Sequence, residues 1–506
     1  MQFNSYIFIL CFLPLTLIGY FGLNHLGKDR LAKLFLLAMS LWFYGYFNVS
    51  YLFIICSSIV VNFAVSKLME KKGGAIKRLL MIAGVLFNVA VIFYFKYYDF
   101  FIANINSLFG TDFVLKNIVL PLGISFFTFQ QISFIVDAYN GEVKDYSFIE
   151  YALFVTFFPQ LVAGPIVLHS ELIPQFKDRN KWSLDFDNLA KGIMLFVRGL
   201  GKKVLIADVF GNAVNWAINQ AAAISAGEGA LTAPEIIILM LSYTFQIYFD
   251  FSGYSDMAIG LGLMLNLDIP MNFNSPYKAV SVADFWKRWH MTLTRFLTRY
   301  IYIPLGGSRK GKLRTYINTL VVFLVSGIWH GANWTFILWG LLHGIAQCFN
   351  KITRGIYENV INAAKKTPVA NIMIGVVKVI CWLVTFAFIN ITWLLFRADS
   401  VDMWLKILKR FTVHYYVVRE DILEPFRIPK LTGVLSGLGV PDSTSLALWV
   451  SLGLFMTMAF VLCLCTTNNY KAKYEKNALS VGITWVLAVL CLVSLSTVST
   501  FLYFNF

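Results

Sequence analysis

A histidine lies near the middle of an apolar stretch of the chain. His330 occurs in the run SGIWHGANW, residues 326–334, inside an apolar segment at 316–349. Ionisable side chains are costly in such surroundings and often carry function where they occur. If the segment is one helix, Ser326, His330 and Asn333 share one face as a polar stripe. Imidazole can take and return a proton near neutral pH, so His330 is a candidate general base. The alternative is a core histidine that is hydrogen-bonded between helices.

The neighbours of His330 set further expectations. Gly327 and Gly331 would allow the backbone of another helix, or a ligand, to approach closely. A second histidine of the segment, His343, follows thirteen residues later and would lie on a different side of a continuous helix. We therefore expect no zinc site made from His330 and His343, and we predict no metal site elsewhere.

A third histidine, His290, occurs in the run DFWKRWHMTLTRF, residues 284–296. On a helical wheel it lies on an apolar side, and basic side chains gather on the opposite arc: Lys287, Arg288, Arg295 and Arg299. Each of these would cost about 2.5–3.5 kcal/mol at the centre of a membrane, and far less at the headgroups. We therefore predict that 282–304 lies along the interface without crossing, with His290 as a second catalytic candidate. The alternative is an aromatic membrane anchor that contains an incidental histidine.

Other polar positions are less specific. Gly306–Lys312 resembles the start of a phosphate-binding loop, but Leu313 stands where a metal-binding Ser or Thr is needed, so a nucleoside triphosphatase is rejected. A basic loop that meets phosphates of a cytosolic donor and a positively charged anchor both stay open. Asp250 and Asp256, in an apolar tract, could line a polar cavity or satisfy helix breaks. The GxSxG pattern of serine hydrolases is absent from the sequence.

The composition places these residues in a membrane protein. Of the 506 residues 58% are hydrophobic and 14% charged, against ~45–50% and ~25% in soluble domains. The net charge of +15 comes from basic residues in short loops between apolar runs. This placement follows the positive-inside rule and argues against nucleic-acid binding. All seven cysteines lie in or beside apolar runs, so a disulfide framework is not expected.

Many apolar segments are long enough to span a membrane: 5–23, 34–66, 79–98, 117–138, 148–168, 188–208, 234–265, 316–349, 371–396, 446–466 and 478–502. The segment 34–66 would be about 50 Å long as one helix, against a hydrocarbon core of ~30 Å. We predict a break at 45–48 and two spans. Two spans place both flanking basic loops, 24–33 and 67–78, on the cytoplasmic side. The first span carries no basic region before it and is expected to be retained.

The whole chain, 1–506, is therefore predicted to form one all-α membrane domain with roughly ten to twelve crossings. Its chemistry-bearing motifs lie at 282–344. The longest polar stretch, 398–445, is expected to form surface helices outside the membrane core.

At these motifs the sequence resembles the membrane-bound O-acyltransferase superfamily, and within it the alginate O-acetyltransferase-like branch. Residues 284–307 are similar to that branch's "DFW-RWH" segment followed by "YIPLGG". Residues 326–344 resemble its "G-WHGA-W---WG--HG" segment, and 157–166 and 248–262 match two further stretches. The resemblance covers most of the chain and weakens after about residue 400.

The resemblance implies roles for individual residues. His330 matches the near-invariant catalytic histidine of the superfamily, and His290 matches a second signature position, which is His in this branch. We expect His290 to position substrate or stabilise charge. Substrate contacts are expected from neighbouring residues and from one carboxylate in an apolar tract: Trp289, Ser326, Trp329, Asn333 and Asp250. The implied fold is a ring of tilted helices around a thin membrane centre, with a tunnel between the two faces.

The resemblance also implies a reaction. The donor would be a cytosolic acyl thioester, acetyl-CoA, with no bound cofactor. The acceptor would be a polysaccharide such as alginate-like polymer, cellulose or peptidoglycan, reached directly or through an extracytoplasmic relay partner. The expected location is the cytoplasmic membrane, with lipid around the helices. One alternative is D-alanyl transfer towards lipoteichoic acid; another, from a different class, is a proton-coupled transporter or flippase.

The charge pattern yields a test of orientation. A cysteine introduced in the second basic loop (Lys72→Cys) should be cytoplasmic, because basic loops stay on that side. In intact cells it should resist a maleimide that cannot cross the membrane and react only after the cells are opened. Labelling of intact cells at position 72 would show that the orientation is wrong.

Overall fold

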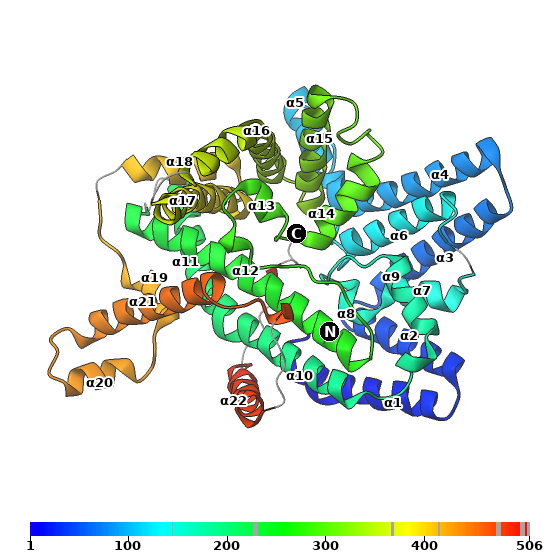
Figure 1. The fold of residues 1–506 in the computed structure, drawn as a ribbon, viewed down its shortest axis with the longest axis horizontal. Helices are drawn as coiled ribbons and strands as arrows, with labels where there is room; N and C mark the ends of the chain where they lie inside the picture. The colour runs from blue at the N-terminus through cyan, green and yellow to red at the C-terminus, as the bar shows by residue number, and fades with distance from the viewer. Residues whose placement is uncertain are drawn as a thin grey trace.

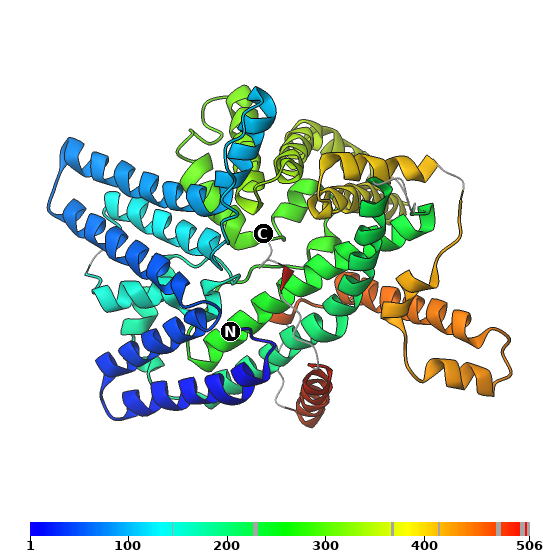
Figure 2. The ribbon, with the colours of Figure 1, turned by 180° about the vertical axis from the view of Figure 1, so that it is seen from behind.

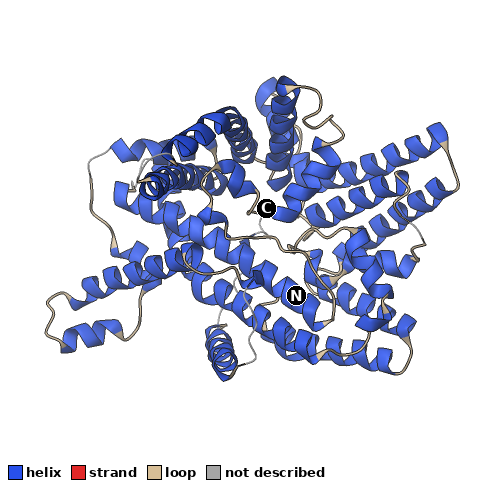
Figure 3. Ribbon diagram, in the orientation of Figure 1, coloured by secondary structure: helices blue, strands red, loops and turns tan. Residues whose placement is uncertain are grey.

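The computed structural model describes residues 1–143, 145–225, 231–365, 369–412, 415–471, 477–495 and 501–502, with the side chains of 223–225 left out. Helices joined by turns and loops make up these residues, and no strand occurs among them (Figure 3). The prediction of an all-α chain is confirmed.

The N-terminal part contains α1 (Leu13–His25), α2 (Asp29–Gly45), α3 (Ser50–Glu70), α4 (Gly74–Ile92), α5 (Tyr98–Phe109), α6 (Ile124–Tyr139), α7 (Phe148–Thr156), α8 (Phe158–Leu161) and α9 (His169–Lys177). The middle contains α10 (Phe186–Gly201), α11 (Asp208–Ser225), α12 (Ala233–Met264), α13 (Val282–Trp286), α14 (Met291–Leu297), α15 (Lys312–His330) and α16 (Trp334–Ala364). The C-terminal part contains α17 (Ala370–Arg397), α18 (Val401–Lys409), α19 (Glu420–Leu423), α20 (Leu431–Gly437), α21 (Ser443–Leu464) and α22 (Ala478–Ser494). The π-helical turns are η1 (Phe8–Phe12), η2 (Phe93–Tyr97), η4 (Lys202–Ala207) and η6 (Thr298–Tyr302).

Within the described residues, six helical stretches are long and apolar enough to cross a membrane: Phe8–His25, Ser50–Glu70, Gly74–Phe109, Ala233–Met264, Ala370–Arg397 and Ser443–Leu464. Many large apolar side chains of these stretches are exposed on the surface, as a lipid-facing helix requires, except in Ala233–Met264, which is mostly buried within the protein. The chain is thus a multi-pass membrane protein. The number of crossings stays a prediction.

The predicted division of the segment 34–66 is confirmed, because α2 ends at Gly45 and α3 begins at Ser50. The prediction of one span at 148–168 is wrong. That segment is divided between α7, α8 and a loop, with Pro159 in the first turn of α8. Proline has no backbone N–H and breaks a helix interior. Residues 151–168 are buried in the protein, so their apolar character reflects a core and not a lipid-facing surface.

The predicted span at 117–138 also starts late. Its helix, α6, begins only at Ile124, after Gly123 with φ +72°. A Cβ at Gly123 would lie 2.8 Å from the backbone oxygen of Leu161, so this turn brings the start of α6 against α8.

The polar segment 398–445 contains the short helices α18, α19 and α20, and α20 and α21 extend together from the body of the protein (Figure 1).

Helices α10 and α12 lie side by side across the middle of the molecule (Figures 1 and 2). Two pairs of glycines bring their backbones into contact. A Cβ on Gly199 would lie 2.6 Å from the oxygen of Gly253, and a Cβ on Gly192 would lie 2.6 Å from the oxygen of Gly260. In each helix the two glycines are seven residues apart and therefore share one face. Small residues at this spacing allow the close packing on which helix association in membranes depends.

The α10–α12 contact predicts a stability effect. Gly199→Leu should force the two backbones apart and cost about 1–3 kcal/mol, the usual penalty of overpacking. The matched control is Gly375→Leu in α17, because nothing lies within 4 Å of a Cβ at Gly375. Thermal unfolding of the purified variants in detergent measures the difference. Equal melting temperatures for the two variants would contradict the close contact.

Candidate active site

The chain reverses direction directly after His330. Helix α15 ends at His330, Gly331 is extended, and α16 begins at Trp334 with Asn333 as its N-cap. The side-chain oxygen of Asn333 accepts a hydrogen bond of 3.0 Å from the backbone N–H of Thr335, the usual cap of a helix start. The single helix that the stripe of Ser326, His330 and Asn333 requires is therefore interrupted after His330. Asn333 consequently does not continue the helical stripe of Ser326 and His330.

Helices α15 and α16 pack against each other through glycines. A Cβ on Gly327 would lie 2.4 Å from the oxygen of Phe336 and 3.1 Å from the Cα of Gly340. The expectation that Gly327 permits close approach of a neighbouring helix is confirmed. The approach turns the end of α15, and with it His330, towards the first turns of α16.

Aromatic side chains surround His330, which is buried. Its ring centroid lies 4.9 Å from that of Trp329, 5.2 Å from that of Trp339 and 5.2 Å from that of Phe396. An enclosure of this kind keeps bulk water away from the imidazole.

His343 lies much nearer to His330 than the sequence predicted. Because α16 folds back along α15, the ring of His343 packs 4.6 Å from Trp339, which in turn packs on His330. Both nitrogens of His343 are occupied. Nδ1 accepts from the indole N–H of Trp286 at 3.1 Å, and Nε2 lies 3.2 Å from the hydroxyl of Thr392. His343 therefore supports the fold around the site.

The helix predicted over 282–304 is interrupted at His290. The structure has α13 up to Trp286, a turn, α14 from Met291, and then the π-helical turn η6. His290 itself has φ +44°, which is rare for a residue with a side chain and costs of order 1–3 kcal/mol. The surroundings must enforce this conformation. The helical wheel that placed His290 on an apolar side of one continuous helix was therefore wrong.

Asn272 fixes the orientation of His290. The Oδ1 atom of Asn272 accepts from the backbone N–H of Thr292 at 3.3 Å and from its hydroxyl at 2.9 Å. A backbone N–H can only donate, so this atom is the carbonyl oxygen of the amide. The same oxygen lies 3.1 Å from Nδ1 of His290, which must therefore carry the proton. In the neutral ring Nε2 then has the lone pair and can act as an acceptor or base.

Two residues of the basic arc predicted for this segment pair with carboxylates from other elements. Arg295 binds Glu171 at 2.7 Å, and Arg299 binds Asp137 at 3.0 Å. Arg288 binds Asp284 within the segment at 2.9 Å. These ion pairs connect 284–299 to α6 and α9. That the segment lies along the membrane interface stays a prediction.

Trp329 joins the two catalytic candidates. Its ring centroid is 6.0 Å from that of His290 and 4.9 Å from that of His330. The indole is held in place from the other side, because it stacks on Phe129 at 5.1 Å and donates to the backbone oxygen of Ser125 at 3.3 Å. Two histidines forty residues apart in sequence thus reach the same buried side chain.

Buried polar atoms lie beside this group without a hydrogen-bond partner among the described residues: Ser326 Oγ, Thr335 Oγ1 and Trp339 Nε1. Ser326 is one helical turn before His330, and Trp339 packs on the imidazole ring of His330. Buried polar groups are normally hydrogen-bonded, so such atoms need a ligand or water. The site therefore offers both donors and an acceptor to a polar substrate.

Three predicted substrate contacts lie elsewhere. Trp289 packs between Phe285 and Trp393, with ring centroids 5.5 Å and 4.9 Å away, in a neighbouring aromatic cluster. Asn333 caps α16. Asp250 binds the ammonium group of Lys203 at 2.7 Å. A substrate role for Trp289 and Asp250 stays a prediction without geometric support, and a role for Asn333 stays a prediction as well, although Asn333 also lines a groove.

Sequence reasoning missed Asn272 and Lys96. Asn272 carries no signal of its own, because an asparagine in a loop is common. Lys96 does carry one, since it is a lone charge inside the apolar run 79–98, and such charges are functional candidates. Its ammonium group lies 2.7 Å from the oxygen of Trp329 and 3.0 Å from that of His330.

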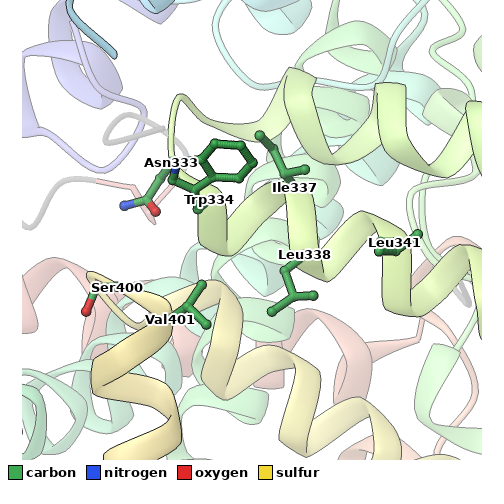
Figure 4. Close-up of a pocket in the computed structure, with 7 residues that line it drawn as sticks. All are labelled: Asn333, Trp334, Ile337, Leu338, Leu341, Ser400 and Val401. Atoms are coloured by element: carbon green, nitrogen blue, oxygen red, sulfur yellow. The ribbon is translucent and has the colours of Figure 1, made fainter. Parts of the chain in front are cut away.

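An open groove of about 530 Å³ lies next to the chain reversal (Figure 4). The N-terminal part of α16, from Asn333 to Leu341, forms one wall, and Ser400 and Val401 at the start of α18 form the other. Its lining carries no titratable side chain, so the groove itself supplies no acid or base.

Comparison with known proteins identifies relatives of this chain. The chain is 44% identical over 434 residues to a peptidoglycan O-acetyltransferase of Helicobacter pylori, covering 80% of this chain and 79% of that protein. It is 37% identical over 413 residues to a probable alginate O-acetylase of Pseudomonas aeruginosa, covering 80% and 73%.

More distant similarity extends to a teichoic acid D-alanyltransferase of Streptococcus thermophilus, 25% identical over 291 residues, which cover 56% of this chain and 69% of that protein. A model of the membrane-bound O-acyltransferase family matches residues 9–397. Both histidines and the chain reversal between α15 and α16 lie inside the matched region. The chain is therefore an acyltransferase that belongs to the membrane-bound O-acyltransferase family.

Proposed function

We propose that this enzyme transfers an acetyl group from cytosolic acetyl-CoA across the membrane to hydroxyl groups of peptidoglycan, directly or through a relay partner. The observation that carries the proposal is the arrangement of His290 and His330 against Trp329 in a buried interior. A transporter with a histidine proton relay is not favoured, because the family match identifies an acyltransferase.

His330 acts as the general base. It takes the proton of the acceptor hydroxyl while the hydroxyl oxygen attacks the thioester carbonyl. The tetrahedral intermediate then collapses, the carbon–sulfur bond breaks, and the imidazolium returns the proton to the thiolate. The products are an acetate ester and free CoA. The aromatic enclosure of His330 favours transfer to the acceptor over hydrolysis.

His290 positions the acceptor. With its proton on Nδ1, bound to Asn272, the neutral ring presents a lone pair at Nε2. Such a ring accepts a hydrogen bond from a hydroxyl group but cannot donate one to an oxyanion. Of the two roles expected from the sequence, substrate positioning is the one that this tautomer supports.

The donor enters from the end of α15 that is opposite His330. The basic loop Gly306–Lys312 leads into α15, and Arg309 and Lys310 in it are exposed. The 19 residues of α15 span about 28 Å between this loop and His330. A long, flexible donor with its phosphates at the loop and its thioester near the histidine suits this separation. Cationic side chains and a helix N-terminus both favour phosphate groups.

The choice of acceptor and acyl group rests on similarity. The peptidoglycan O-acetyltransferase is more similar to this chain than the alginate or D-alanyl relatives named above. The expected setting is the cytoplasmic membrane, where cytosolic donor and extracytoplasmic polymer meet. Loss of ester-linked acetate from peptidoglycan after deletion of the protein would distinguish this acceptor from alginate, cellulose and teichoic acid.

Substitution of the histidines tests the mechanism. His330→Ala should lower acetyl transfer at least about 100-fold, the usual contribution of a general base, with a melting temperature close to wild type. His290→Ala should lower the rate less, because it removes positioning only. His343→Ala should lower the melting temperature instead, because it leaves the buried indole N–H of Trp286 without its acceptor. Transfer of labelled acetate and thermal unfolding are measured in parallel.

His343→Ala serves as the matched control, since it removes a buried imidazole that packs on Trp339, as His330 does. Full activity in His330→Ala would contradict the mechanism. Activity that followed the melting temperature across all three variants would show that His330 supports the fold and does not take part in the reaction.

A further inference from the structure

Lys96 is a charged side chain beside His330 that the proposed reaction does not use. It lies in η2, the π-helical turn between α4 and α5, far from His330 in sequence. Its Nζ donates to the backbone oxygens of Trp329 at 2.7 Å and His330 at 3.0 Å, and to the hydroxyl of Ser125 at 3.3 Å. Three donors thus meet three acceptors, which satisfies the ammonium group fully.

The contacts of Lys96 close the end of α15. The last four carbonyl groups of a helix have no partner within it, and the C-terminus carries the negative end of the helix dipole. A cation placed at the C-terminus can bind the unpaired carbonyl groups and also interacts favourably with the helix dipole. The next residue, Tyr97, adds a third contact, because its hydroxyl donates to the backbone oxygen of Ile328. Three consecutive carbonyl groups at the end of α15 are therefore bound by two consecutive residues of η2.

Lys96 and Tyr97 are the last two residues of the π-helical turn η2. A π-helical turn inserts one residue and widens the helix locally, and such turns are frequent at functional sites. Ser125, at the start of α6, also binds the site directly, since its backbone oxygen accepts from the indole of Trp329.

We propose that Lys96 is a positioning residue for His330, which it holds at the end of α15 by binding the carbonyl groups of residues 329 and 330. This inference rests on the proposed function, because it concerns the placement of the base in that reaction. Lys96 touches no reacting atom; its effect passes through the backbone to the two side chains of Trp329 and His330.

The test separates positioning from folding. Lys96→Met keeps the length of the side chain but removes the donors, so kcat should fall about 10- to 100-fold, as for a base displaced by about 1 Å. KM for acetyl-CoA should stay within about twofold. Lys96→Arg should restore most of kcat, because a guanidinium group can donate to both carbonyl oxygens. The matched control is Lys116→Met, which removes an exposed lysine that lies over Tyr94 and Tyr98.

Each variant is purified from membranes and assayed with acetyl-CoA, and its thermal unfolding is recorded. Wild-type kcat in Lys96→Met would overturn the inference. Equal losses in Lys96→Met and Lys96→Arg that match their loss of folded protein would overturn it too, since a structural role behaves this way. The proposed function is tested separately by His330→Ala. An inactive His330→Ala beside a fully active Lys96→Met would refute only the role of Lys96.

Discussion

Helix α15 ends inside the protein, where its last carbonyl groups must find hydrogen-bond donors. An apolar interior offers few, and unsatisfied buried carbonyl groups are expensive. Lys96 and Tyr97 supply the donors at Ile328, Trp329 and His330. The chain can then turn at Gly331 and start α16 at Trp334. The position of His330, the return of α16 along α15 and the enclosure by Trp339 all depend on this buried helix end.

His290 is also buried, and the backbone around it is held by a different set of contacts. The backbone of His290 adopts φ +44° and is fixed by contacts with Asn272. The backbone N–H of Met291 donates to the backbone oxygen of Asn272 at 2.9 Å, and the hydroxyl of Thr292 donates to the side-chain oxygen of Asn272. Ion pairs from Arg295 and Arg299 then attach the segment to α6 and α9. Rigid attachment of both histidines suits a reaction in which a base must meet its substrate within a fraction of an ångström.

Much of this could be predicted from the sequence. Composition and positive loops identify a helical membrane protein, the length of 34–66 requires a break, and the rarity of buried imidazole singles out His290 and His330. The change of chain direction at residues 331–333 could not be predicted. Apolar residues flank these positions, and the pattern of a long apolar run is the same for one helix as for two. For the same reason the segment 148–168, which is buried from residue 151 onward, looked like a span. The partners of Arg295, Lys96 and His290 are distant in sequence, and only the tertiary fold brings them together.

The central claim is that one buried site, with His330 as its base, passes an acyl group from one side of the membrane to the other. Sealed vesicles with the cytoplasmic face outward, loaded with peptidoglycan fragments, test it directly. Labelled acetyl-CoA is added outside, and ester-linked label is measured inside. The account predicts internal label with the wild-type enzyme and almost none with His330→Ala. Internal label that is unchanged by His330→Ala, or wild-type label that stays outside the vesicles, would contradict it.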